Sequence, residues 1–194
     1  MLSNSQAKQD LFVYALSKKD NGLFFDIGSH HPIRINNTYA LEQLGWRGYL
    51  FDIDNSWEPL TKETRKSKFV CTDVRNYNWD LFLQDEGLVG ATYDYLSFDV
   101  DEASLATLKR FPFEKIKFNI CTIEHDRYRF GLTVANEMRT IMIQNGYKLL
   151  CKDICNDGYP YEDWYVHSDF MTDSEIQSKY CEGLDWKDAL KIYV

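Results

Sequence analysis

Short apolar runs alternate along the chain with segments that repeat apolar residues at helical spacing. The run GLFFDIG follows the Asp20-Asn21-Gly22 turn and is typical of a buried strand. Residues 133–145 have helical periodicity and stop at Gly146, as expected of a helix. We expect strands at 23–27, 49–52, 68–71, 93–99, 117–124, 147–154 and 162–168. Helices are expected at about 5–18, 38–44, 56–65, 79–83, 102–110 and 133–145.

This order of elements predicts an α/β fold in a single domain over residues 1–194. Strands that alternate with helices form right-handed βαβ units, so we expect a mostly parallel seven-stranded sheet with helices on both faces. The last two strands are too close in sequence for a helix between them and should form an antiparallel hairpin. Residues 1–20 should form a lead-in helix, and residues 169–194 a polar C-terminal tail.

The composition supports one well-cored domain. Of the 194 residues, 44% are hydrophobic and 15% aromatic, which excludes intrinsic disorder. A formal net charge of −8 argues against nucleic acid as a partner. The sequence has neither a membrane-spanning apolar run nor a signal-peptide pattern, so we expect a cytoplasmic protein without a membrane partner. A local basic run is expected to be a solvated helix face: it contains Lys62, Arg65, Lys66 and Lys68.

Acidic residues follow five successive predicted strands. They are Asp26, Asp52, Asp54, Asp73, Asp99, Asp101, Glu124 and Asp126. In open α/β sheets, ligands bind beyond the carboxyl ends of the strands, where the strand order reverses. A single acid in such a place is usually only solvated, but five consecutive strand ends predict a ligand site.

The first strand ends suggest a ligand that contains a ribose. Gly28 lets the backbone approach a ligand closely, and Asp52 at the end of the next strand can accept hydrogen bonds from a ribose diol. The segment DIGSHHPIR lacks the further glycines of a dinucleotide fingerprint, so a cofactor without phosphates fits better. S-adenosylmethionine is such a cofactor. Its cationic groups suit Asp26 and Asp99, and Asp73 could accept from the adenine amino group.

Several segments also carry a family resemblance. The stretch GLFFDIGSHHPIRINNTYALEQLGWRGYLFDID resembles the N-terminal signature of the FkbM-type methyltransferases, which use S-adenosylmethionine and have a Rossmann-like class I fold. The segments SQAKQDLFVYAL, DYLSFDVDEAS, ICTIEHD, and NGYKLL with YEDWYV resemble further family motifs in the same order. The chain departs from the family at Asp52-Ile53, where Glu-Pro is usual, and at Asp101-Glu102-Ala103-Ser104, where an acid followed by Gly-Ala-Glu is usual.

The resemblance implies which residues surround the cofactor. It places Asp26, Gly28 and Ser29 around the methionine part of S-adenosylmethionine. It places Asp52, followed by Ile53, at the ribose, and Asp73 with Val74 at the adenine.

Transfer of a methyl group to a hydroxyl needs alignment of the acceptor and removal of its proton. His125 is our first candidate for the base, with Glu124 or Asp126 to orient its ring, and His30 is the second. The alternative for each histidine is a structural role at a βα turn. The alternative is catalysis with a divalent metal such as Mg²⁺. Its oxygen ligands would be Asp99, Asp101, Glu124 and Asp126.

The aromatic residues of the closing hairpin have two interpretations. Tyr159, Tyr161 and Trp164 are expected to complete the core and the packing of the hairpin, and the alternative is a stacking wall for a sugar acceptor. The sequence as a whole predicts an O-methyltransferase that acts on a hydroxyl of a small molecule or glycan. The alternatives are a non-catalytic binding protein with the same fold and, less favoured, a nucleotide-dependent oxidoreductase.

Overall fold

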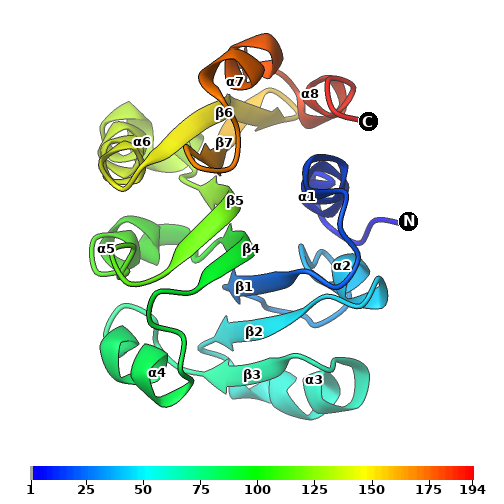
Figure 1. Cartoon of the computed structure of the whole chain (residues 1–194), viewed down its shortest axis with the longest axis vertical. Helices are drawn as coiled ribbons and strands as arrows, with labels where there is room; N and C mark the ends of the chain where they lie inside the picture. Colours follow the sequence, from blue (N-terminus) through cyan, green and yellow to red (C-terminus); the bar gives the residue numbers. More distant parts are fainter. Residues whose placement is uncertain (1) are drawn as a thin grey trace.

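An eight-stranded sheet forms the centre of the computed structural model, which describes residues 2–194 (Figure 1). Its strands are β1 (Leu23–Ile27), β2 (Arg47–Asp52), β3 (Lys68–Cys71), β4 (Thr92–Phe98), β5 (Lys117–Glu124), β6 (Tyr147–Asn156), β7 (Tyr159–His167) and β8 (Cys181–Glu182). They lie in the order β3-β2-β1-β4-β5-β7-β6-β8. Strand β7 is antiparallel to β5 and β6, and the other pairs in this sheet are parallel. The strand order therefore reverses between β1 and β4.

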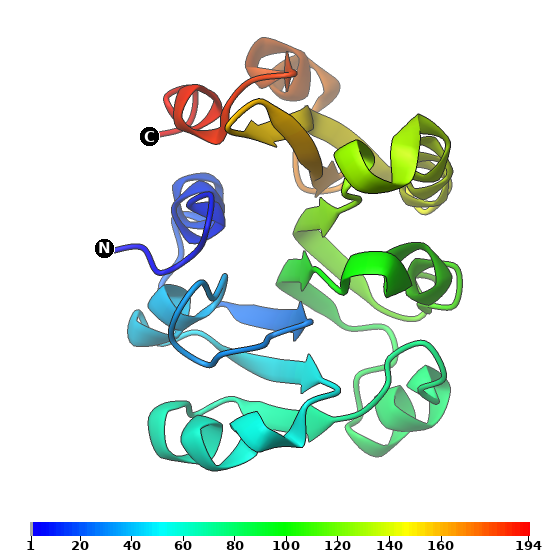
Figure 2. The same ribbon diagram turned by 180° about the vertical axis from the view of Figure 1, so that it is seen from behind.

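Helices cover both faces of the sheet. They are α1 (Gln9–Ser17), α2 (Tyr39–Gln43), α3 (Glu58–Thr64), α4 (Trp79–Asp85), α5 (Ser104–Leu108), α6 (Arg127–Gln144), α7 (Asp173–Lys179) and α8 (Trp186–Leu190), with short 3₁₀ turns at Asn55–Trp57 and Asp101–Ala103. Helices α4, α5 and α6 lie on one side, and α1, α2 and α3 on the other (Figures 1 and 2). The predicted fold class, a mostly parallel α/β sheet with an antiparallel hairpin, is confirmed.

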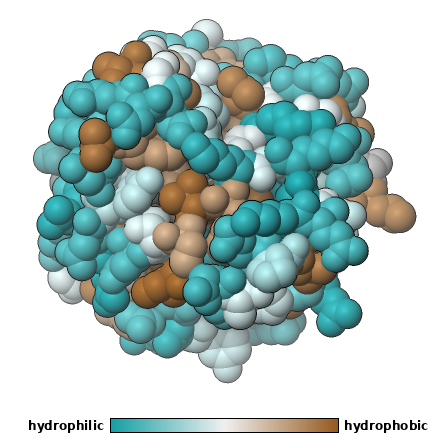
Figure 3. Space-filling model, turned by 90° about the horizontal axis from the view of Figure 1, so that it is seen from below, coloured by the Kyte–Doolittle hydropathy of each residue, from teal (hydrophilic) through white to brown (hydrophobic). Residues whose placement is uncertain are grey.

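Two hydrophobic clusters fill the space between the sheet and its helices. Phe25 and Ile27 of β1 face the cluster under α4, α5 and α6, whereas Phe24 faces the cluster under α1 and α2. Because both faces of the sheet are covered, the strand appears in the sequence as a continuous apolar run. By contrast, the surface seen from below is mainly hydrophilic, with apolar side chains in small groups (Figure 3).

The structure differs from the expected elements near the C-terminus. It has eight strands rather than seven, because the two-residue β8 pairs with β6 and is too short to produce a sequence pattern. Residues 169–194, expected as a polar tail, contain α7, β8 and α8, with Ile176, Cys181 and Ala189 buried in the core. Of the helices within residues 2–194, none combines the length and apolar character needed to cross a membrane.

Helix α6 also begins earlier than the predicted helix at 133–145. It starts at Arg127, and Gly131 interrupts its helical backbone with a φ of 84°. The interruption explains why the periodic pattern starts only after this glycine.

The aromatic ring of Phe12 joins the two ends of the chain to the hairpin. It stacks on Trp164 of β7 at 4.2 Å between ring centroids and meets Tyr193 edge-on at 5.1 Å. Phe12 and Trp164 are fully buried. Both the N-terminal helix and the C-terminal segment therefore depend on this contact.

We expect Phe12→Ala to lower the free energy of unfolding by about 3–5 kcal/mol, because it leaves a cavity between three elements. Phe12→Leu keeps most of the volume and should cost less than about 1.5 kcal/mol. Urea unfolding followed by tryptophan fluorescence measures both values. Equal losses for the two variants would contradict the role given to the ring.

Candidate active site

A cavity of about 690 Å³ opens beyond the carboxyl ends of β1, β2, β3 and β4, beside the reversal of strand order. It is lined by Gly28, His30, His31, Arg34, Ile35, Phe51, Asp52, Ile53, Asp54, Thr72, Asp73, Val74, Arg75, Asp99, Val100, Asp101, Glu102 and Ala103. Four successive loops thus contribute to one wall, as expected for a ligand site in this type of sheet.

Gly28 sits where the backbones of β1 and β4 come closest. Its φ is +86°, and a Cβ at this position would lie 1.5 Å from the carbonyl oxygen of Asp99. The amide groups of Gly28 and Ser29 both donate to the Phe51 carbonyl, at 2.9 and 3.0 Å. The loop after β1 is therefore fixed to β2, and only glycine leaves room for β4.

Asp52 ends β2 with its carboxylate beside the cavity. Oδ2 accepts from the backbone N–H of His30 at 2.6 Å, and Oδ1 accepts from that of Asp54 at 2.9 Å. These bonds fix the carboxylate, and each oxygen keeps a further lone pair for a ligand. Ile53 is 65% exposed and lines the cavity next to it. Asp52 and Ile53 together suit a diol that lies between a carboxylate and an apolar side chain.

At the end of β3, Asp73 and Val74 line the same cavity. The Asp73 carboxylate accepts from the Arg75 guanidinium, with Nη2 to Oδ2 at 2.7 Å, and these hydrogen bonds hold the pKa of Asp73 below its ordinary value. A ligand amino group at Asp73 would therefore share the carboxylate with Arg75. Val74 and Phe51 are buried and provide an apolar surface for a flat ring.

Asp26 and Ser29 are buried and are not among the residues that line the cavity. Asp26 is 2% exposed and accepts from Thr38 Oγ1 at 2.7 Å, and burial raises the pKa of this carboxyl. Ser29 is also buried, and its carbonyl accepts from Asn36 Nδ2 at 2.9 Å. The geometry thus gives both residues a role in holding the loop after β1, at a place where the resemblance implied direct contact with the cofactor.

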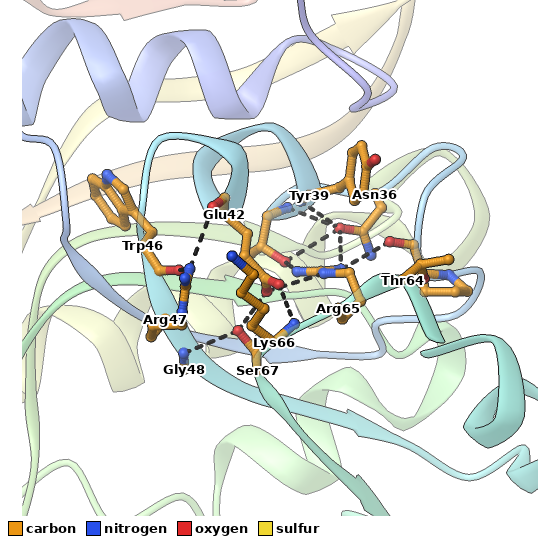
Figure 4. A network of polar contacts seen from close by, with 12 residues as sticks. Asn36, Tyr39, Glu42, Trp46, Arg47, Gly48, Thr64, Arg65, Lys66 and Ser67 are labelled. Carbon is orange, nitrogen blue, oxygen red and sulfur yellow. Dashed lines mark hydrogen bonds and ion pairs between the residues drawn. The ribbon is translucent and has the colours of Figure 1, made fainter. Parts of the chain in front are cut away.

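Arg65 is the centre of the network that supports this loop (Figure 4). Its guanidinium is fully buried, with Nε 3.1 Å from Glu42 Oε2. Nη1 donates to the Pro32 carbonyl at 2.9 Å and to Asn36 Oδ1 at 3.1 Å, and Nη2 donates to Thr38 Oγ1 at 2.9 Å. The prediction of a solvated basic face is wrong for Arg65. The Pro-containing loop and the paired Glu42 lie far from it in sequence, and no local pattern indicates their contact.

A pair of carboxyl groups lies between the ends of β4 and β5. Asp99 and Glu124 are hydrogen-bonded to each other, and burial raises the pKa of both groups. The charge of Asp99 raises that of Glu124 further. Each of these two carboxyl groups therefore opposes the ionisation of the other. Asp99 lines the large cavity, and both residues line a second, adjacent one.

The predicted metal ligands are only partly brought together. Asp101, Glu124 and Asp126 each place a carboxylate oxygen within 4.8 Å of the others. Arg129 Nη1 already lies 2.9 Å from both Asp101 and Asp126 and supplies a positive charge there. This arrangement is an ion-pair cluster, and its geometry gives no support to the metal that the sequence allowed.

The two candidate histidines have different surroundings. His30 lines the large cavity, with its ring 5.0 Å from that of Trp57. His125 is 2% exposed: its Nδ1 accepts from the Arg127 N–H at 3.1 Å, and its Nε2 lies 3.3 Å from Asp163 Oδ1. Because His125 is buried and lines neither of these two cavities, its geometry supports a positioning role between β5 and β7. Its predicted service as a base has no support from these contacts.

The sequence matches no family model and no curated protein. Solved structures do resemble it. The O-methyltransferase from Bacillus cereus in complex with S-adenosylhomocysteine matches with a TM-score of 0.53 at 10% identity, over 86% of this chain and 82% of that one. An rRNA methylase from Streptococcus thermophilus matches with a TM-score of 0.52 at 11% identity, over 86% and 98% of the two chains.

A third match includes a small-molecule substrate. The 1,6-didemethyltoxoflavin-N1-methyltransferase from Burkholderia thailandensis, with its substrate and S-adenosylhomocysteine bound, has a TM-score of 0.51 at 11% identity, over 85% and 79% of the two chains. The chain therefore has the Rossmann-like fold of S-adenosylmethionine-dependent methyltransferases.

Replacing Arg65 tests the network under the loop. We expect Arg65→Met to lower the free energy of unfolding by about 3–5 kcal/mol, because it leaves the Glu42 carboxylate buried without its partner. Lys62→Met, on the preceding turn of α3, breaks only an exposed pair with Glu58 and should cost less than about 1 kcal/mol. Chemical denaturation compares the two, and similar small losses would contradict the assigned role.

Proposed function

We propose that this protein is an S-adenosylmethionine-dependent O-methyltransferase that acts on a hydroxyl group of a small molecule or sugar. The observation that carries the proposal is the wall formed by Gly28 and Asp52. Gly28 lets the loop after β1 pass close to the Asp99 carbonyl at the cavity, and Asp52 is held by two backbone N–H groups with its oxygens beside the cavity. The sequence segments that resemble the FkbM-type enzymes support the same conclusion.

The cavity suits each part of the cofactor. Asp52 would accept from the ribose diol, while Val74 and Phe51 would pack against the adenine. The carboxyl group of Asp99 lies where the large cavity meets the second one. When bound, S-adenosylmethionine supplies an electrophilic methyl group on a sulfonium. A carboxylate beside that cationic end contributes electrostatic attraction.

The Asp99–Glu124 pair can also take the proton of the acceptor hydroxyl. Of the two residues, Asp99 lines both cavities, so we take its carboxylate as the base. The ionised Asp99 oxygen is available to an acceptor in the second cavity. This assignment places the base on a carboxylate that contacts both cavities.

The charged residues that line the second cavity indicate the class of acceptor. The second cavity is lined by five carboxyl groups and one arginine, so a phosphate backbone would be repelled. This supports an uncharged or cationic small molecule over a nucleic acid.

Isothermal titration calorimetry with S-adenosylhomocysteine tests the cofactor assignment. We expect Asp52→Ala to weaken binding at least about tenfold, because the ribose loses charged hydrogen-bond acceptors. Asp85→Ala, at an exposed position in α4, should leave the affinity unchanged. Absence of binding would contradict the proposed function and would support a non-catalytic protein with the same fold. A preference for NAD over S-adenosylhomocysteine would support the oxidoreductase alternative instead.

The base assignment predicts a pH dependence. Because the pKa of Asp99 is raised, its ionised form is lost at a higher pH than for an ordinary aspartate. Methyl transfer to a panel of monosaccharides and small polyols should therefore rise with pH through a value above about 4. Asp99→Asn should lower kcat by about 100-fold or more, whereas Glu124→Gln should retain the larger share of activity. The reverse ranking would assign the base to Glu124.

A further inference from the structure

The second cavity has a volume of about 400 Å³ and shares Asp99 and Asp101 with the first. Three more acids complete its negative lining, Glu124, Asp126 and Asp157. The one cation among its lining residues is Arg129. A cavity next to the cofactor site with this excess of carboxyl groups has a strongly negative potential.

The guanidinium of Arg129 is already paired with two of these carboxylates. Its Nη1 lies 2.9 Å from Asp101 Oδ1 and 2.9 Å from Asp126 Oδ2. Asp157, in contrast, has no ion-pair partner among residues 2–194. It lies in the turn between β6 and β7 with a φ of 51°, at an exposed place. A carboxylate that lines the cavity is therefore left for a ligand.

Two aromatic rings at this cavity point to the same kind of ligand. Tyr128 and Tyr159 both line it, are 51% and 60% exposed, and lie 5.5 Å apart between ring centroids. Tyr159 is exposed and does not complete the core, whereas Tyr161 and Trp164 are buried as expected. Exposed aromatic faces attract cations through their quadrupole, and ammonium groups in particular.

The hydroxyl group of Tyr161 adds a buried donor. Tyr161 lines the cavity and is 5% exposed, and its hydroxyl accepts a long bond of 3.5 Å from Gln9 Nε2. Among the described residues, no acceptor for its own proton is found within hydrogen-bond reach. A neutral oxygen of a ligand would satisfy it.

We propose that the second cavity binds an acceptor that carries both an ammonium group and hydroxyl groups, such as an amino sugar or amino polyol. The inference rests on the proposed function, which supplies the cofactor site beside it. Asp157 and the rings of Tyr128 and Tyr159 hold the ammonium group, Tyr161 donates to an acceptor oxygen, and a hydroxyl reaches Asp99. The carboxylates and the aromatic rings are chemically independent, and both select a cation.

Glucosamine and N-acetylglucosamine are a matched pair of probes, because they differ in whether the amine is charged. Each is titrated by calorimetry into the protein saturated with S-adenosylhomocysteine. We expect glucosamine to bind about tenfold more tightly or better, and the difference to shrink as salt is added.

Variants test which residues cause the preference for glucosamine over N-acetylglucosamine. Asp157→Asn, an isosteric change that tolerates the same backbone, should reduce the preference for glucosamine by about threefold. Tyr159→Leu should reduce it by a similar factor, about threefold. Asp85→Asn makes the same charge change at the exposed end of α4, far from the hairpin in Figure 1, and should leave the preference intact.

Equal affinity for the two sugars would overturn the inference, as would an unchanged preference in Asp157→Asn. A loss of S-adenosylhomocysteine affinity in Asp157→Asn would assign the cavity to the cofactor's own ammonium group and overturn it too. Displacement of glucosamine by Mg²⁺ at equal concentration would indicate that the cavity is a metal site and would also overturn the inference. If S-adenosylhomocysteine itself does not bind, the proposed function fails, whereas the other outcomes reject the acceptor class alone.

Discussion

At the carboxyl ends of β1 and β4, two backbone segments approach so closely that a Cβ on Gly28 would lie 1.5 Å from the Asp99 carbonyl oxygen. This contact brings the loop after β1 against the loop after β4 and leaves the cavity between them and the ends of β2 and β3. The Asp99 carboxyl group owes its position to the same contact. The large cavity and the acidic pair thus share one geometric origin.

The contact between Gly28 and Asp99 fixes where the loop after β1 begins, but other interactions must hold the rest of this loop. Residues 29–38 have little regular structure, and buried polar groups hold them. Asp26 and Arg65 both hydrogen-bond to the hydroxyl group of Thr38 in this loop. Such a network is costly when incomplete, because each member leaves a buried charge or dipole unsatisfied when its partner is removed. The loop is therefore held in one arrangement before a ligand arrives.

The sequence predicted the strands and the acids at their ends well, because both follow from local patterns. Apolar runs mark strands buried on two faces, and parallel strands end at one edge. The roles of Arg65 and His125 could not be predicted in this way. Arg65 contacts Glu42 and His125 contacts Asp163, and both contacts join segments that are distant in sequence. The short β8 was missed for a related reason, since two residues show no periodicity.

Asp99 lines both cavities, so charged ligands in the two cavities would interact through this one carboxyl group. Any ligand that favours the ionised form of this carboxyl group on one side changes the affinity for a charged ligand on the other side. The coupling is reciprocal, so each ligand alters the affinity of the other by the same factor. Two cations that compete for the field of one carboxylate oppose each other, whereas a neutral ligand on one side does not. A change from a cationic to a neutral occupant of the first cavity would thus strengthen binding of a cation in the second without movement of the backbone.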